Sequence, residues 1–476
     1  MTATYLLKIF HNIQHSNRVC CQIDSKDYTY QDLKNRISVF ASNIQSVPSK
    51  RIGVVLNDDF DTYCHIIACW MFGKAYVPLN PNYPIQRLQD ICDLADLTHI
   101  IGVPSPQIQA LNLIEISEDT PSNDWTLTEV QTTAEAYVLF TSGTTGKPKG
   151  VPISILNLDS FYEGFFELGY KLSEKDRFLQ MFDLTFDLSV MSFMIPLSLG
   201  ASFYTLSKSL VKPLALYDTL ESNKISFALM VPSAVEMLEP YQNDIELNEL
   251  RYTQFCGEAF KEKQFNIWRT CAPFSQIDNV YGPTEATIYC TRFKVYSIDS
   301  TNNEFHKQGI FSIGHPMKHT RLYLDEEDEL LLGGSQVTSG YLKPNSQMIN
   351  AFIQVGEERY YRSGDTASFE DGLYYCHGRK DDQVKIQGYR VELSEIEYAA
   401  SNDFPTIANK AIVLENSIHL IIKTIKDVHL SDIEQSLNQK LPWYMRPSKI
   451  HFINEFPLNA NGKIDKNALK EWIQSK

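Results

Sequence analysis

The hydrophobic positions in the first 260 residues fall into short apolar runs separated by segments of helical spacing. Short apolar runs are typical of buried strands, and apolar residues every three or four positions are typical of amphipathic helices. The two patterns alternate, with strands expected at 51–56, 75–79, 98–102, 178–182, 201–206, 227–231 and 252–256, and helices at 60–72, 85–95, 188–199, 212–223 and 232–238. This alternation predicts two α/β lobes of similar order, each built on a largely parallel sheet.

The pattern changes twice in the second half of the chain. Residues 310–375 show alternating strands and glycine-rich turns, which indicates a β-rich subdomain. After Arg379 a short polar stretch leads into a strand, helix and strand pattern typical of a small α+β domain. We therefore expect an α/β protein whose N-terminal domain, residues 1–380, holds two packed α/β lobes and the β-rich subdomain. A small α+β domain, residues 381–476, would follow it.

Length, charge and cysteine content exclude several classes of protein. A chain of 476 residues exceeds one ordinary core, so more than one domain is expected. The net charge of −15 argues against general binding to nucleic acid or to anionic membranes. No apolar run is long enough to span a bilayer, and no signal peptide is recognised. Nine irregularly spaced cysteines without a C-x-x-C pair argue against a disulfide framework or a zinc site, and favour a cytoplasmic protein with reduced thiols.

The most informative stretch is the loop that follows the apolar run 136–140. Residues 141–150 contain three glycines, four hydroxyl side chains and two lysines. A strand that leads into such a loop lets backbone N–H groups and hydroxyls converge on an anion. The order of residues differs from a Walker loop, because Pro148 follows Gly146-Lys147 and blocks a direct helix start. The loop predicts phosphate binding, and a flexible surface loop is the alternative.

The chain contains further motifs, in this order: 73–84 before the loop, and 279–287, 333–341, 360–365, 378–381, 388–393 and 459–465 after it. Together with the loop they resemble the adenylate-forming enzymes, which include acyl-CoA ligases, luciferases and the adenylation domains of peptide synthetases. The resemblance covers almost the whole chain. It implies a large N-terminal domain and a mobile C-terminal domain with Asp381 as the hinge. It also implies two reactions: a carboxylate attacks the α-phosphorus of ATP to give an acyl-adenylate, and a thiol then takes the acyl group.

The resemblance assigns roles to named residues. Lys463 would bridge the substrate carboxylate and the α-phosphate, Thr284 and Glu285 would act beside it, and Glu285 would bind Mg²⁺. Asp365 would hold the ribose and Tyr281 would stack on adenine. The alternatives are a solvated Lys463, a helix-start Glu285, a turn-forming Asp365 and a core Tyr281. The full set expected to bind ATP is Thr141, Ser142, Gly143, Thr144, Thr145, Gly146, Lys149, Asn279, Val280, Tyr281, Gly282, Pro283, Thr284, Asp365, Cys376, His377, Gly378 and Arg379.

Asp187 carries the most information about the substrate. In the amino-acid-activating branch of the family, an aspartate at this point pairs with the substrate α-ammonium, and an unpaired buried carboxylate would be costly. The alternative is an N-cap for the helix at 188–199. The pocket of Asp187, Met191, Cys256, Val280, Ile288 and Lys463 resembles that of the branch that loads D-alanine onto a carrier protein, although Cys256 would also serve as a small buried hydrophobe. Tyr289, where a small residue is expected, and 183–185 depart from that branch.

The acyl acceptor is expected to be the phosphopantetheine thiol of a separate carrier protein, whose docking face on this chain would be locally basic or apolar. The leading hypothesis is an ATP-dependent, AMP-forming amino acid–carrier protein ligase that acts as a monomer. One alternative is a stand-alone adenylation enzyme of the peptide-synthetase type for another small amino acid. Two others are a carboxylic acid–CoA ligase and an adenylate-binding regulator without catalytic activity.

Overall fold

The computed structural model describes residues 3–118, 121, 125–143, 146–295, 306–307, 309–386, 388–404, 408–423, 429–458 and 464–475. The chain divides into two compact units. The first unit comprises Met1–Pro81, Cys92–Leu139 and Gly150–Lys380. The second unit comprises Asn82–Ile91, Phe140–Lys149 and Asp381–Lys476, so the phosphate-loop segment groups with the C-terminal residues.

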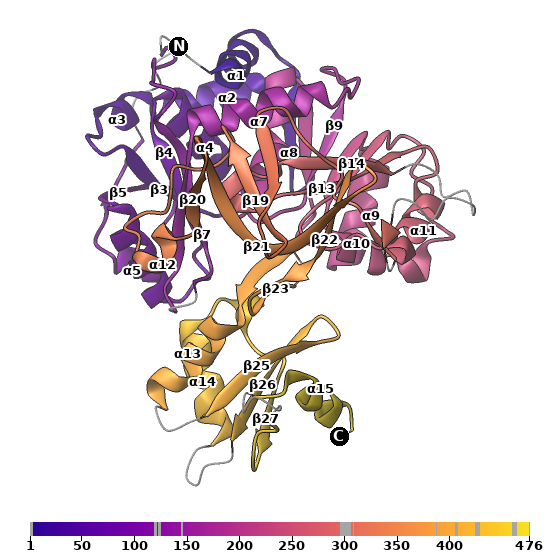
Figure 1. Cartoon of the computed structure of the whole chain (residues 1–476). Helices are drawn as coiled ribbons and strands as arrows, with labels where there is room; N and C mark the ends of the chain where they lie inside the picture. Colours follow the sequence, from indigo (N-terminus) through magenta and orange to yellow (C-terminus); the bar gives the residue numbers. More distant parts are fainter. Residues whose placement is uncertain are drawn as a thin grey trace. The chain divides into compact units, whose positions relative to one another are not determined.

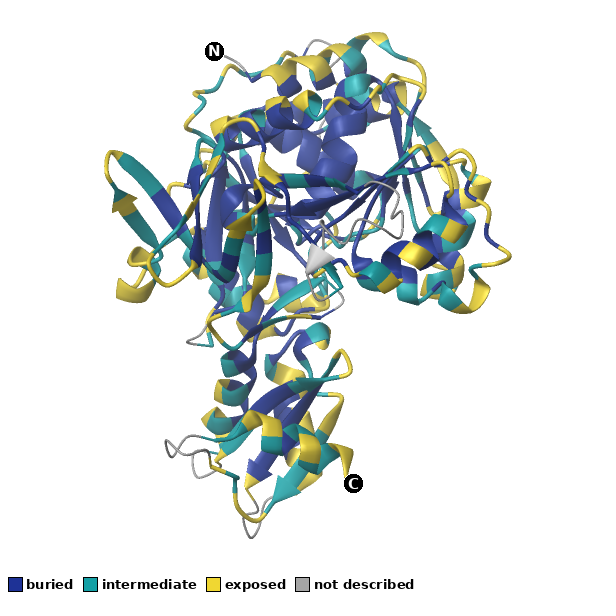
Figure 2. Cartoon of the chain, turned by 45° about the vertical axis from the view of Figure 1, so that its right-hand side comes forward, coloured by how far each residue is buried: buried dark blue, intermediate teal, exposed yellow. Residues whose placement is uncertain are grey.

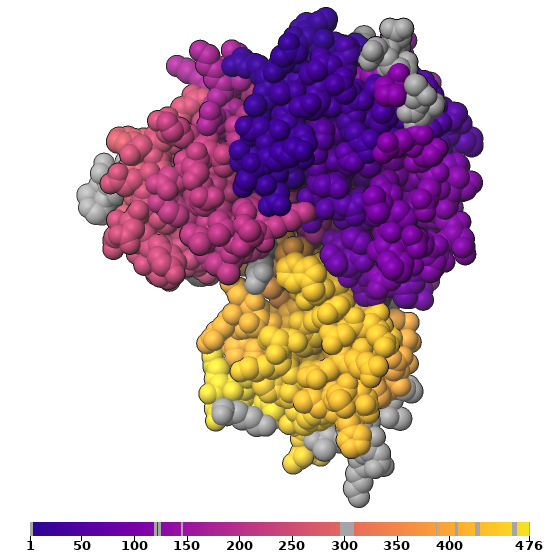
Figure 3. Space-filling view, turned by 180° about the vertical axis from the view of Figure 1, so that it is seen from behind, coloured from indigo at the N-terminus to yellow at the C-terminus, as the bar shows by residue number. Residues whose placement is uncertain are grey.

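A nine-stranded sheet in the order β17-β14-β13-β12-β11-β9-β10-β1-β2 runs through the first unit. Its central strands, from β13 to β1, are parallel, and β14, β17 and β2 are antiparallel to their neighbours. The pairing of β1 with β10 joins segments far apart in sequence, and Figure 3 shows indigo N-terminal residues beside the pink part of the unit. The bounds are Val19–Ile23 (β1), Lys26–Thr29 (β2), Arg177–Gln180 (β9), Ser202–Thr205 (β10), Phe227–Met230 (β11), Tyr252–Phe255 (β12), Gln276–Tyr281 (β13), Thr291–Val295 (β14) and His315–Pro316 (β17).

A second sheet has six strands in the order β6-β5-β3-β4-β7-β8. The strand β3 pairs in parallel with both β4 and β5, and β4 pairs in parallel with β7. The two sheets confirm the predicted pair of α/β lobes. The bounds are Arg51–Val55 (β3), Ala75–Leu79 (β4), His99–Ile101 (β5), Ile114–Glu115 (β6), Glu135–Thr141 (β7) and Lys149–Ser154 (β8).

The helices of the lobes begin and end where local chemistry predicts. The Asp59 side chain caps α4 by accepting the N–H of Thr62, and Gly73, with φ of +70°, follows the last turn. Helix α8 is buried along almost its whole length and ends at Gly200, with φ of +73°. Helices α1, α2 and α7 gather at the top of Figure 1. The bounds are Thr4–His15 (α1), Tyr30–Ser38 (α2), Ala41–Ser46 (α3), Phe60–Met71 (α4), Ile85–Ala95 (α5), Pro106–Gln109 (α6), Ile155–Glu167 (α7), Asp187–Leu199 (α8), Lys212–Ser222 (α9), Pro232–Glu236 (α10), Glu262–Cys271 (α11) and Ser346–Ile349 (α12).

The predicted β-rich subdomain is an antiparallel sheet in the order β18-β19-β21-β20, with β22 paired to β21. A separate hairpin joins β15 and β16. The long strand β21 carries Asp365, and its register places Asp365 opposite Arg379 of β22. The bounds are His306–Lys307 (β15), Ile310–Phe311 (β16), Thr320–Leu324 (β18), Glu329–Gly334 (β19), Phe352–Val355 (β20), Glu358–Glu370 (β21) and Leu373–Arg379 (β22).

The C-terminal residues of the second unit form a small α+β fold. A hairpin of β23 and β24 precedes a three-stranded sheet in the order β25-β26-β27. Helices α13 and α14 pack with this sheet around a core of their own that includes Ile396, Leu420 and Leu437. The role of Asp381 as a hinge stays a prediction. The bounds are Gln383–Ile386 (β23), Tyr389–Glu392 (β24), Leu393–Asp403 (α13), Asn409–Leu414 (β25), Ser417–Lys423 (β26), Leu430–Lys440 (α14), Lys449–Ile453 (β27) and Lys466–Gln474 (α15).

The core of the first unit lies between its sheets and helices. Figure 2 shows these central elements in dark blue and an exposed outer layer in yellow. The largest fully buried side chains are aromatic, and they include Trp268, Tyr76 and Tyr137. All nine cysteines are free thiols. Among the described residues, the helices are all too short or too polar to cross a bilayer.

Candidate active site

Asp187 is the first residue of α8 and is 6% exposed. Phe186 occupies the N-cap position, so the helix begins one residue earlier than predicted and the alternative that Asp187 caps it is wrong. The oxygen Oδ2 has no hydrogen-bond partner among the described residues. Burial raises the pKa of Asp187 to about 7, although hydrogen bonds from the Thr284 side chain and the Ile288 backbone act in the opposite direction. A buried carboxylate with an unsatisfied oxygen favours a cationic ligand group.

The other described residues predicted to surround the amino acid are buried in one hydrophobic core. Met191 follows Asp187 by one helical turn on α8. Strands β12 and β13 are parallel neighbours in register, so Cys256 at the end of β12 lies beside Val280 of β13. Ile288 is 1% exposed and follows β13 after a short turn. The fold thus buries these small and medium apolar side chains in one core with helix α8.

The backbone next to Asp187 is strained. Thr287 and Ile288 have φ of +57° and +70°, a region that β-branched residues rarely adopt. Buried hydrogen bonds hold this turn, because the Thr287 hydroxyl donates to the Gln336 carbonyl at 2.5 Å and the Gln336 amide donates to the Tyr289 carbonyl at 3.0 Å. The strain presents the Ile288 N–H toward Asp187, since that bond contributes to the pKa of the carboxyl group.

Tyr289, the bulky residue at a position where a small one is expected, is completely buried. Its ring packs edge-on against Phe161 at 5.0 Å, and its hydroxyl donates to the Gln254 side chain at 2.9 Å. Its backbone runs close to Gly282, where an added Cβ would lie 2.4 Å from the Tyr289 Cα. The bulk of Tyr289 is therefore satisfied within the core, and Gly282 is required by that close approach.

Glu285 is completely buried in the short 3₁₀ helix Thr284–Ala286. Its oxygen Oε1 accepts a hydrogen bond from the Tyr341 hydroxyl at 2.6 Å. A buried carboxylate offers the hard oxygen that Mg²⁺ prefers. No group of three or more potential metal ligands occurs among the described histidine, cysteine and acidic residues. Tyr341 lies in a recognised motif, but nothing in the sequence assigned it to Glu285, 56 residues away.

Asp365 lies at the centre of a second buried network. The Tyr281 hydroxyl donates to Asp365 Oδ2 at 2.5 Å, and the Arg379 guanidinium lies 3.4 Å from Oδ1. Burial and the nearby carboxylate of Asp365 raise the pKa of Tyr281. The structure thus brings together three predicted ATP-binding residues from β13, β21 and β22. Each carboxylate oxygen of Asp365 has one of these partners. Because an ionised carboxylate has about four acceptor sites, Asp365 can still accept hydrogen bonds from a diol.

The remaining predicted ATP-binding residues of the first unit lie near these strands. The Asn279 amide donates to the Ser312 carbonyl at 2.8 Å, and His377 Nε2 lies 2.8 Å from the Ser368 hydroxyl on the exposed side of β22. Pro283 is the N-cap of the short helix that holds Glu285, Cys376 is half-buried, and Gly378 has φ of +132°.

Of the predicted phosphate-loop residues, Thr141 is the last residue of β7, Lys149 is the first residue of β8, and Ser142, Gly143 and Gly146 lie between them. The hydroxyl of Thr141 is buried without a hydrogen-bond partner among the described residues. An added Cβ at Gly143 would lie 2.0 Å from the Lys147 carbonyl oxygen, so this turn requires glycine. Thr144, Thr145 and Lys463 lie outside the described residues.

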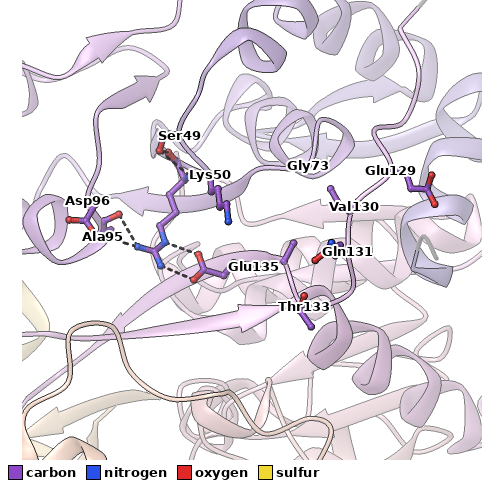
Figure 4. Close-up of a pocket in the computed structure, with 12 residues that line it drawn as sticks. Ser49, Lys50, Gly73, Ala95, Asp96, Glu129, Val130, Gln131, Thr133 and Glu135 are labelled. Atoms are coloured by element: carbon purple, nitrogen blue, oxygen red, sulfur yellow. Dashed lines mark hydrogen bonds and ion pairs between the residues drawn. The ribbon is translucent and has the colours of Figure 1, made fainter.

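A cavity of about 750 Å³ contains none of the predicted site residues. It lies where β3 and β7 begin, and Arg51 and Glu135, the first residues of these strands, form a bidentate ion pair with both contacts at 2.7 Å (Figure 4). Lys50, Asp96 and Glu129 also line it, so the cavity carries charges of both signs.

Comparison with known proteins shows which proteins this chain is similar to. The model of the AMP-binding enzyme family matches residues 11–342. The D-alanine–D-alanyl carrier protein ligase of Staphylococcus aureus (strain JH9) is 30% identical over 466 residues, which are 94% of either chain. The Vibrio cholerae adenylation domain AlmE, solved with glycyl-adenosine-5′-phosphate, has a TM-score of 0.86 at 23% identity and covers 100% of this chain and 98% of its own.

A third comparison shows that the fold extends to enzymes of another kind. The o-succinylbenzoate CoA synthetase MenE from Bacillus subtilis has a TM-score of 0.82 at 17% identity, with coverage of 99% and 98%. The fold alone therefore does not distinguish between substrates. The match of the family model over most of the chain and the relationship at 30% identity do establish the family. The chain belongs to the AMP-binding enzyme family.

Proposed function

We propose that this protein uses ATP to activate an amino acid, D-alanine, as the aminoacyl-adenylate, and then transfers the aminoacyl group to the phosphopantetheine thiol of a carrier protein. The observation that carries the proposal is the buried Asp187 carboxylate, whose Oδ2 has no hydrogen-bond partner in the described part of the chain. An α-ammonium group is the substrate feature that would satisfy this oxygen. Similarity to the Staphylococcus aureus ligase over nearly the whole chain supports both the substrate and the acceptor.

The first reaction joins the amino acid to the α-phosphate. A carboxylate oxygen of the amino acid attacks the α-phosphorus, the bond from that phosphorus to the bridging oxygen breaks, and pyrophosphate leaves. Such a transfer depends on positioning and charge neutralisation. Asp187 would orient the ammonium group, Lys463 would bridge the attacking carboxylate and the α-phosphate, and Asp365 would hold the ribose hydroxyls.

The second reaction moves the acyl group to sulfur. The thiol sulfur attacks the carbonyl carbon of the adenylate, the carbon–oxygen bond to AMP breaks, and the thiol proton is released. The same pocket holds the amino acid in both steps, so Asp187, Met191 and Cys256 would contribute to specificity in each. The proposed motion of the C-terminal residues about Asp381 would exchange one set of catalytic groups for the other.

The residues present fit a bound Mg²⁺ ion in one respect. Glu285 is buried and has one oxygen fixed by Tyr341, which suits a carboxylate that must meet a cation in a defined position. When bound, Mg²⁺ would neutralise charge on the triphosphate. The metal role of Glu285 rests on this fit and on the family resemblance.

Another small amino acid is the second candidate substrate. The side chains of Met191, Cys256, Val280 and Ile288 are buried and of small to medium size, which suits a small substrate side chain. A carboxylic acid without an amino group is disfavoured, because it would leave Asp187 buried and unpaired. An inactive regulator is disfavoured by the assembled Glu285 and Asp365 networks.

Substrate-dependent exchange of pyrophosphate into ATP tests the proposal. The panel is D-alanine, L-alanine, glycine, serine and propionate, which is alanine without the amino group. We expect the fastest exchange with D-alanine and none with propionate. Fastest exchange with another amino acid would replace the substrate, and exchange with propionate would overturn the role of Asp187. Loading of a phosphopantetheinylated carrier, followed by mass, tests the second reaction.

A further inference from the structure

Two carboxylates of the second unit interact with the groups of the phosphate loop that would bind phosphate. The Gly143 N–H donates to Glu395 Oε2 at 3.1 Å. The Lys149 ammonium lies 3.6 Å from Glu392 Oε1. Both acids lie at the start of α13, where Glu392 is the N-cap and Glu395 is in the first turn. Backbone N–H groups and lysine are the donors that such a loop offers to phosphate, so carboxylate oxygens stand here in the role of phosphate oxygens.

The position of Glu395 is fixed by a buried ion pair. Arg87 donates to Glu395 Oε1 at 2.8 Å, and each side chain is 4% exposed. The two oxygens of Glu395 are thus divided between Arg87 and the Gly143 N–H. A buried ion pair is tolerated only when hydrogen bonds satisfy it. The Gly143 N–H supplies such a bond, so the loop is part of what stabilises Glu395.

Two further contacts hold the loop against the same segment. The Ser142 hydroxyl donates to the Arg390 carbonyl at 3.0 Å and accepts the Glu392 N–H at 3.2 Å. The ring of Tyr398 on α13 covers Gly146, where an added Cβ would lie 2.2 Å from a ring carbon. Ser142, Gly143, Gly146 and Lys149 of the loop therefore all contact the segment that leads into and forms α13.

We propose that Glu395 is a positioning residue that competes with the ATP triphosphate for the phosphate loop. The Gly143 N–H has one hydrogen and donates to one strong acceptor at a time. ATP binding would require Glu395 to leave the loop, and departure of pyrophosphate would allow it to return. ATP would therefore bind only when Glu395, and α13 with it, has moved away from the Gly143 N–H. Nucleotide binding and the position of α13 are thus linked. The inference rests on the proposed function, because it takes the loop as the triphosphate site.

ATP affinity distinguishes competition from a purely structural role. Removing a competitor raises the apparent ATP affinity by the reciprocal of the fraction of molecules in which the site was open. Loss of a structural ion pair would lower thermal stability and would not tighten ATP binding. Glu395→Gln keeps the size of the side chain and an oxygen acceptor, and Glu395→Ala removes both. Glu397→Gln is the matched control, since Glu397 lies on the same helix and pairs with Lys410 instead of the loop.

The experiment is calorimetric titration of the full-length chain and these three variants with ATP and with inorganic pyrophosphate, both with Mg²⁺. We expect Glu395→Ala to bind both ligands about three- to tenfold more tightly, Glu395→Gln to show a smaller gain, and Glu397→Gln to match the parent. Single-turnover transfer from the adenylate to the carrier thiol should slow in the Glu395 variants only.

Each outcome has a distinct meaning. Unchanged or weaker ATP affinity in both Glu395 variants, with the parent chain binding ATP, overturns the inference and leaves the proposed function standing. If Glu395→Ala fails to fold, Glu395→Gln decides, because its amide can remain beside Arg87. A parent chain that binds no ATP at all would refute the proposed function, and the inference with it.

Discussion

The hydroxyl oxygen of Tyr341 lies 2.6 Å from the carboxylate oxygen Oε1 of Glu285, and both side chains are buried. This bond fixes one oxygen of the proposed Mg²⁺ ligand. We expect Tyr341→Phe to lower kcat/KM for Mg-ATP about tenfold, because one buried hydrogen bond to a charged group is worth about 1.5 kcal/mol or more. Tyr323→Phe, which removes an exposed hydroxyl, is the control. Equal rates for both variants would show that Tyr341 does not position Glu285.

The raised pKa of Asp187 predicts how amino-acid binding depends on pH. Burial moves its pKa to about 7, so the carboxylate becomes protonated as the pH falls below that value. Only the ionised form pairs with an α-ammonium group. We expect KM for the amino acid in pyrophosphate exchange to rise toward about tenfold per unit below pH 7, with KM for ATP changing less. A KM that is flat from pH 5.5 to 8 would contradict the assignment of Asp187.

The same shift makes a prediction for stability. A carboxyl group whose pKa is raised from 3.8 to about 7 stabilises the folded state at low pH and loses that contribution as the pH rises through this window. Asp187→Asn removes the ionisation. We expect the variant to lose exchange activity and to gain thermal stability over the parent at pH 8, by up to about 4 kcal/mol. At pH 4 the two chains should melt alike, which differential scanning calorimetry would measure.

The alternation of apolar runs and amphipathic segments was sufficient to predict the two lobes, because strand and helix periods differ. Helix α8 begins at Asp187 and not at Leu188, since the apolar pattern starts one residue after the backbone becomes helical. The phosphate loop was predictable for a related reason: a run of Gly, Ser and Thr after a strand has a local physical meaning.

The networks of the site were not predictable from periodicity. Tyr341 and Glu285 are 56 residues apart, Tyr281 and Asp365 are 84 apart, and Arg87 and Glu395 are 308 apart. These pairs meet only because separate elements pack together. Tyr289 shows the same limit, since its packing partner Phe161 lies 128 residues away in the sequence.

A variant of Lys463 can distinguish the chemical step from nucleotide binding. Its proposed role is to bridge the attacking carboxylate and the α-phosphate, where charge develops in the transition state. We expect Lys463→Ala to abolish adenylate formation, with a loss of about 100-fold or more, while ATP affinity measured by calorimetry changes little. Lys470→Ala, in the helix that follows, is the control. Near-normal adenylate formation by Lys463→Ala would refute the catalytic role.

The turn at Gly143 tests whether the loop geometry itself is required. An added Cβ would lie 2.0 Å from the Lys147 carbonyl oxygen, which is backbone and has no flexible end to move aside. Gly143→Ala should therefore displace the N–H groups of the loop and weaken ATP binding by more than about tenfold, because a displaced loop loses several aligned donors at once. Gly169→Ala is the matched control: its φ of +82° is strained for alanine, but no atom lies within 4 Å of the added Cβ. We expect that variant to lose about 1 kcal/mol of stability and to keep its ATP affinity. If both variants bind ATP like the parent, backbone donors at Gly143 do not form the phosphate site.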